Sequence, residues 1–221
     1  MTLTGCLEPE KCNKADFLFV IDNSGSMDDH QENLIKNIPT FIGEIELEIE
    51  DLDYHVGVVF TDEYSGNPEG CQQLGSLITH SITRQNEDDG PVACFPNNSK
   101  RSYITNNDQN EQDIFDCIAR LGTSGSPEEQ PLKAIEQLVK NRESSCNNGF
   151  IRDDAILVVT MITDEGDFSD VDVETLQRQL QDLKNGMPNA IVLLSLLKEL
   201  ELEQSQTNLL QQVANVLIAN L

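Results

Sequence analysis

The chain has 221 residues, of which 38% are hydrophobic, and its 39 acidic against 14 basic residues give a net charge of −25. This excess of acids excludes nucleic acid and anionic membrane surfaces as direct partners, because phosphate binding depends on Lys and Arg. No stretch approaches the roughly 20 apolar residues of a membrane span, which excludes direct membrane insertion.

Apolar runs alternate along the chain with segments of helical spacing. An apolar run at 16–21 predicts a first strand, and a helix is expected at 29–47, where Pro39 should bend or split it. A second strand is expected at 54–60, followed by a Gly-, Asn-, Asp- and Pro-rich stretch with a short strand near 76–83. The remaining elements are expected helices at 109–120 and 129–141, a strand at 155–163, a helix at 172–184, a strand at 190–197 and a last helix at 205–219.

This alternation predicts an α/β fold with a doubly wound, mostly parallel sheet, flanked by helices on both faces. We expect an N-terminal extension at 1–14 and one domain at 15–221. An insertion at about 61–105 is expected to form a disulfide-stapled surface loop. In sheets of this kind, ligands bind beyond the carboxyl ends of the strands, so polar residues at those ends are the first candidates for a site.

The residues that end the first expected strand carry the strongest chemical signal. Asp22, Ser24 and Ser26 alternate in Asp22-Asn23-Ser24-Gly25-Ser26, directly after the apolar run. A tight turn at Gly25 can direct all three side-chain oxygens at one point. Hard oxygen donors of this kind suit a small hard cation, with Mg²⁺ first and Mn²⁺ or Ca²⁺ next.

The sequence Phe-Val-Ile-Asp-x-Ser-x-Ser-Met at 19–27 resembles the opening of a von Willebrand factor type A (VWA) domain, in which D-x-S-x-S begins the metal-ion-dependent adhesion site. The segments at 129–132 and 149–155 are similar to those of bacterial surface lipoproteins of this family. The resemblance implies two further ligands. Asp164, after the strand at 155–163, matches the family's second aspartate, and Thr123 matches its threonine, with Ser124 and Ser126 as alternatives.

The same resemblance implies what the site does. Carboxylates that act partly through water leave the cation with residual positive charge and a replaceable water, which a Glu or Asp of a partner can displace. In integrin inserted domains the last helix also shifts to change affinity, and nothing in this sequence shows that the helix at 205–219 does so.

A second group of acids follows the expected site. Glu165, Asp167 and Asp170 alternate with other residues after Asp164, and Asp62 ends the second strand. In one interpretation these acids form an additional Ca²⁺ site, or Asp62 instead lies at the rim of the adhesion face. The alternatives are solvated loop acids, or a general base at Glu165 or Asp167 that would activate water.

Six well-separated cysteines indicate disulfides and an oxidising compartment, with free thiols as the alternative. Of fifteen pairings, we expect Cys71–Cys94 around the insertion and Cys117–Cys146 around a helix pair, which leaves Cys6–Cys12. Leu3-Thr4-Gly5-Cys6 also matches a lipoprotein cleavage site, so a lipid anchor at Cys6 is a further alternative.

Together these observations favour a non-enzymatic, metal-dependent binding module that is secreted, periplasmic or held at a cell surface. The main alternative is a structural or assembly subunit of a surface apparatus. A metal-dependent hydrolase is the remote alternative, because no nucleophile elbow, P-loop or dinucleotide fingerprint is present in the sequence.

Overall fold

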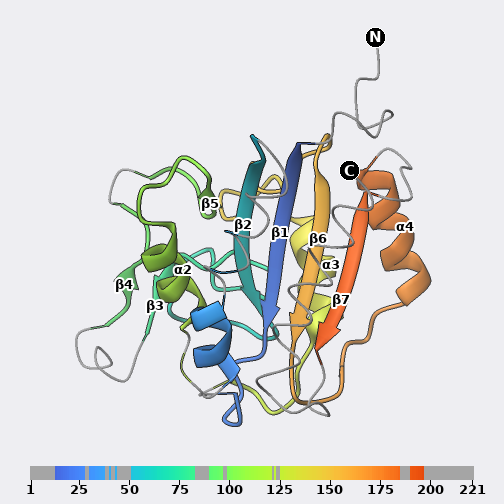
Figure 1. The fold of residues 1–221 in the computed structure, drawn as a ribbon. Coiled ribbons are helices and arrows are strands. Elements are labelled where there is room, and N and C mark those ends of the chain that lie inside the picture. The colour runs from blue at the N-terminus through green and yellow to red at the C-terminus, as the bar shows by residue number, and fades with distance from the viewer. Residues whose placement is uncertain are drawn as a thin grey trace.

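A computed structural model describes residues 13–27, 30–37, 40, 43, 51–82, 90–96, 99–120, 122, 125–184 and 190–196. In this part of the chain the fold is mixed α/β, with a mostly parallel central sheet (Figure 1). The expected helix at 205–219, and Pro39 in the expected helix at 29–47, lie outside the described residues.

The central sheet has five strands in the order β5-β2-β1-β6-β7. Four of them are parallel, and the short β5 pairs antiparallel to β2 at the edge. The arrowheads of β1, β6 and β7 point to the same end in Figure 1, so these strands bring their carboxyl ends together. The strands are β1 (Lys14–Ile21), β2 (Asp53–Phe60), β5 (Ile104–Thr105), β6 (Ile156–Ile162) and β7 (Ile191–Leu196), and the four parallel ones confirm the predicted strands to within two residues.

Alternate residues of the buried strands face two separate apolar clusters. Phe17, Phe19 and Ile21 of β1 belong to one cluster, together with α2 (Glu111–Ala119) and Leu34. Leu18 and Val20 belong to the other cluster, together with α3 (Pro131–Lys140) and α4 (Val173–Leu183). Residues 30–37 are helical, as are residues 40 and 43. Both faces of the sheet are therefore covered by helices, which explains why its strands are apolar on both sides.

The inserted region after β2 contains a second, two-stranded sheet. β3 (His80–Ser81) lies in the stretch where a short strand was predicted, and it pairs antiparallel with β4 (Val92–Ala93). The last part of the inserted region, β5, joins the central sheet. The insertion is therefore attached to the sheet edge as well as by covalent bonds.

The disulfides join Cys71 to Cys146 and Cys94 to Cys117, so the predicted pairings of Cys71 with Cys94 and of Cys117 with Cys146 are wrong. Both bonds link the insertion to the helical layers. Cys6 and Cys12 lie outside the described residues, so their pairing stays a prediction.

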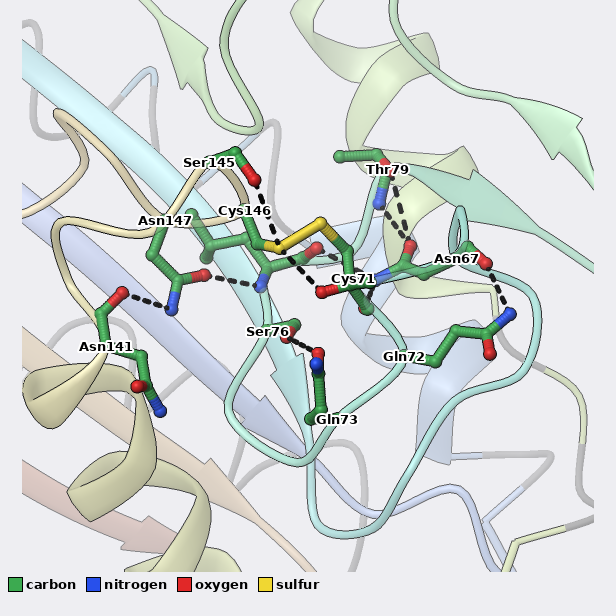
Figure 2. Close-up of a disulfide and its surroundings, with 12 residues drawn as sticks. Asn67, Cys71, Gln72, Gln73, Ser76, Thr79, Asn141, Ser145, Cys146 and Asn147 are labelled. Carbon is green, nitrogen blue, oxygen red and sulfur yellow. Dashed lines mark hydrogen bonds between the residues drawn. A yellow bond between two sulfur atoms is a disulfide. The ribbon is translucent and has the colours of Figure 1, made fainter.

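Side-chain packing explains the first pairing. Asn147, next to Cys146, accepts a hydrogen bond from Leu77 N (3.0 Å) and donates one to Gly75 O (3.1 Å), which holds the loop after α3 against the Cys71 loop. Figure 2 shows Asn147 beside the Cys71–Cys146 disulfide. Asn67 also donates to Cys71 O (2.9 Å). The two cysteines come from segments that are distant in sequence and adjacent in the fold.

The second pairing follows from the position of the small sheet. Cys94 follows β4, and its backbone N–H donates to Thr79 O (2.9 Å). Ser81 on β3 donates to Arg120 O (2.8 Å), just after α2. Because Cys117 lies on that helix, the small sheet places Cys94 beside it.

A buried ion-pair network lies at the amino end of the central strands. Asp16 on β1 is fully buried and accepts hydrogen bonds from Arg152 Nε (2.8 Å) and Arg152 N (2.7 Å). The buried Lys184 lies 3.7 Å from the same carboxylate, and His55 Nδ1 lies 3.6 Å from it. This network ties β1 to the loop before β6 and to the end of α4, away from the carboxyl ends of the strands.

The helices in the described part of the chain are all too short or too polar to cross a membrane. Every cysteine in that part is in a disulfide. The two bonds indicate an oxidising compartment, as expected for an extracellular protein.

Candidate metal centre

Two aspartates meet at the carboxyl end of the sheet. Asp22 directly follows β1, and Asp164 lies two residues after β6, the parallel neighbour of β1. The backbone N–H of Asp22 donates to Ile162 O (2.9 Å), which extends the pairing of these strands by one residue. The parallel sheet thus brings together carboxylates that are far apart in the sequence.

The serines of the Asp22–Ser26 turn connect these two carboxylates. Ser24 N donates to Asp22 Oδ1 (2.7 Å), which folds the turn back over the aspartate. The hydroxyls of Ser24 and Ser26 lie 3.2 Å apart, and Ser26 Oγ donates to Asp164 Oδ1 (3.0 Å). Asp22 and Ser24 are buried, whereas Ser26 is exposed and Asp164 is half-buried. A chain of hydrogen bonds therefore links the four predicted ligand residues at this end of the sheet, and it reaches the surface at Ser26.

Two residues that sequence reasoning missed fix the position of Asp22. Thr163 Oγ1 donates to Asp22 Oδ2 (2.8 Å), and Glu165 N donates to Thr163 Oγ1 (3.1 Å). Gln31, in the helical segment after the turn, donates to Asp22 O (3.3 Å) and to Gly122 O (3.1 Å). Both Asp22 carboxylate oxygens thus accept a hydrogen bond and are oriented before any ligand binds.

Thr123 and Ser124 lie outside the described residues, but their neighbours contact the site. Gly122 is bound by Gln31, and Gly125 N donates to Asn23 O (2.9 Å). A Cβ on Gly125 would lie 2.6 Å from the side chain of Asn23, so this approach requires glycine. Ser126 Oγ accepts a hydrogen bond from Glu128 N (3.0 Å) in its own turn.

Glu129 is a further buried carboxylate that the sequence analysis did not assign to the site. It is 0% exposed, and Thr61, just after β2, donates to its Oε2. Burial raises the pKa of Glu129 to about 8, against the Thr61 hydrogen bond, and the negative charges of Asp22 and Asp62 raise it further. In the sequence it is one of two adjacent acids just before α3, and no local pattern distinguishes it from a solvated residue.

The other acids have separate positions. Asp62 is half-buried after β2, where Ser126 N donates to its Oδ2 (2.8 Å), and burial raises the pKa of Asp62. Asp167 Oδ1 accepts a hydrogen bond from Ser169 N (3.0 Å) in a local turn, and Asp170 is exposed. Within the described ranges, no set of three or more Asp, Glu, His or Cys side chains is arranged to hold a metal ion. Any ion at the candidate centre would therefore depend on hydroxyl ligands.

A pocket of about 600 Å³ is lined by residues that follow β2 and by residues at the start of α3. Two acids, Asp62 and Glu63, line one part of it, and Lys133 lines another. Lys133 is already paired with Glu136 (2.8 Å). The remaining lining residues are Gln73, Leu74, Ser126, Gln130 and Gln137.

Comparisons with known proteins leave the family open. No protein-family model matches the chain, and no curated protein matches it. Among solved structures, two crystal forms of proximal thread matrix protein 1 from the mussel byssus are similar, with 13% and 14% identity and TM-scores of 0.48 and 0.46. The matches cover 92% and 93% of this chain and 48% of each mussel chain, so this chain spans about half the length of those structures.

Proposed function

We propose that this chain is a doubly wound VWA-type domain that binds a divalent cation and presents it to a carboxylate of a partner. Asp22, Ser24, Ser26 and Asp164 would hold the ion, with Thr123 as the fifth ligand residue. The observation that carries the proposal is the contact from Ser24 through Ser26 to Asp164, which joins two strand ends through ligand-type oxygens.

The donor set fits a hard cation. All four described residues offer oxygen, two as carboxylates and two as hydroxyls, which suits Mg²⁺ first and Mn²⁺ or Ca²⁺ next. Thr163 and Ser24 N orient the Asp22 carboxylate, as partners of a ligating carboxylate do in metal sites. An additional Ca²⁺ at Glu165, Asp167 and Asp170 has less support, since Asp167 is engaged in a local turn.

The surroundings favour an acidic ligand group that binds through the ion. Hydroxyl ligands add no negative charge, so a cation whose carboxylates act partly through water keeps positive charge, and the exposed Ser26 places it at the surface. A chain of net charge −25 would otherwise repel a carboxylate. The pocket at the start of α3 gives neighbouring groups of a protein partner room to bind. The proposed reaction is binding without bond cleavage, and the disulfides favour a secreted, periplasmic or cell-surface location.

The proposal can be tested with Mn²⁺ and acetate as probes. Mn²⁺ bound at this centre should keep an exchangeable water and enhance water-proton relaxation. Acetate should reduce that enhancement by displacing the water, and Ser26→Ala should abolish the enhancement. Ser145→Ala, on the loop after α3, is the matched control. Absence of Mn²⁺ binding, or bound Mn²⁺ that is indifferent to acetate, would contradict the proposal.

A further inference from the structure

Phe168 lies in the connection from β6 to α4, and 59% of its surface is exposed. In the described part of the chain, four large apolar residues are exposed, and Phe168 is the aromatic one among them. Figure 1 shows this connection in orange at the carboxyl end of the central strands, where Asp164 also lies. Single exposed apolar residues are common on proteins, so the backbone and the neighbours of Phe168 decide whether it has a role.

The backbone around Phe168 is held against the start of α3. Phe168 N donates a hydrogen bond to Glu129 O (2.8 Å), and Ser169 Oγ accepts one from Lys133 N (3.0 Å). Gln130, the residue before α3, makes no capping hydrogen bond with its own side chain, so Ser169 supplies an acceptor that this helix start requires. The ring of Phe168 is therefore presented to solvent by a fixed backbone.

The fold itself does not use this ring. Val171, in the same connection, packs against the apolar cluster that includes residues of α3 and α4. Phe168 is not among the described residues of either apolar cluster. Loss of the ring should therefore cost the fold little. An ordered aromatic side chain that the fold leaves exposed suits a protein interface, because a few aromatic residues provide much of the binding energy there.

The charges around Phe168 indicate the chemistry of the partner. The segment 164–174 contains six acids and no Lys, Arg or His. Asp167 and Asp170, on either side of Phe168 in the sequence, are both exposed. A negative surface of this kind favours partners with basic residues, since complementary charges speed association and exclude other partners.

We propose that Phe168 is the apolar anchor of the partner-binding face, and that the partner is a protein segment of defined chemistry. This segment carries an Asp or Glu for the ion, apolar side chains that cover the ring of Phe168, and Lys or Arg residues that face Asp167 and Asp170. The inference rests on the proposed function, because the partner carboxylate binds the ion held by Asp164. A small acid such as acetate reaches the ion alone, so the ring distinguishes a protein partner from a free carboxylate.

A phage-displayed library of random peptides, selected against the immobilised chain in Mg²⁺, is the probe. We expect enrichment of peptides that combine an acidic residue, apolar residues and Lys or Arg. Synthetic copies of these peptides should bind Phe168→Ser at least about tenfold more weakly than the wild type, as truncation of an interface anchor does. Val92→Ser is the matched control and should bind like the wild type, because Val92 is 50% exposed and lies in β4, away from the β6–α4 connection (Figure 1).

Two comparisons separate this inference from the proposed function. Peptides that bind Phe168→Ser as tightly as the wild type, but are released by a chelator, would overturn the inference and leave the proposed function standing. Peptides that require Phe168 and stay bound in chelator would support the anchor and contradict metal-dependent binding. Failure to enrich any peptide would overturn the inference, and the proposed function would then be decided by the Mn²⁺ and acetate test. Thermal melts check that Phe168→Ser keeps the fold.

Discussion

Ser26 Oγ donates a hydrogen bond to Asp164 Oδ1 across 3.0 Å, although the two residues are 138 positions apart in the sequence. The contact joins the turn after β1 to the loop after β6. It exists because parallel neighbouring strands end at the same edge of the sheet. The candidate metal centre is therefore a product of strand order, and substitutions that disturb the orientation of its ligands should weaken it.

Thr163→Val should lower Mg²⁺ affinity by about 10- to 100-fold, the usual cost of removing a hydrogen-bond partner of a metal ligand. The substitution keeps the side-chain shape and removes the donor to Asp22 Oδ2. Calorimetric titration with Mg²⁺ measures the effect, and Thr175→Val, at a half-buried position of α4, is the control. Equal affinity in both variants would show that Thr163 does not orient the site.

Loss of the Cys71–Cys146 disulfide should cost more stability than loss of Cys94–Cys117. The first bond closes a loop with a sequence separation of 75, and the second closes one with a separation of 23. A longer closed loop removes more conformational entropy from the unfolded chain. We expect about 4 and about 3 kcal/mol for the paired Cys→Ser variants in denaturant unfolding. A larger loss of stability in the Cys94/Cys117 variant than in the Cys71/Cys146 variant would contradict this order. Peptide mapping of the unreduced protein checks the pairing itself.

Arg152→Met should destabilise the fold by about 3–5 kcal/mol, because it removes the main partner of the fully buried Asp16. Arg142→Met is the control, since Arg142 forms an exposed pair with Glu143 (3.2 Å) and should change stability by about 0–1 kcal/mol. Urea unfolding of the two variants measures both values. If both variants lost only a similar small amount of stability, Lys184 alone would be sufficient to compensate the charge of Asp16.

The stability contributed by His55 should fall as the pH falls. Burial lowers the pKa of His55 below its ordinary value of 6.5, although its hydrogen bond to Phe150 O acts in the opposite direction. The unfolded chain then binds a proton below about pH 6.5 that the folded chain resists, so stability is present above that pH and is lost below it. The stability difference between wild type and His55→Gln should shrink from about pH 7.5 to about pH 5.5 in thermal melts. A difference that is independent of pH would contradict this account.

The strands, and the polar turn that follows β1, could be predicted because their signals are local. The run Phe17–Ile21 is apolar on both faces, as a strand covered by helices on both sides requires, and the Asp22–Ser26 pattern follows it directly. By contrast, the disulfide pairing depends on which loops pack together, and Asn147, which anchors the Cys71 loop, has no sequence signature. Glu129 was missed for the same reason, since its burial follows from the position of α3.

The most direct test of the central claim is a calorimetric titration of the chelator-treated protein with Mg²⁺, compared with Asp164→Asn. The account predicts saturable binding in the wild type and a loss of at least about tenfold in affinity in the variant, with the fold retained because Asp164 is half-buried. No binding to the wild type, or equal binding to both proteins, would contradict a metal centre formed by the ends of β1 and β6.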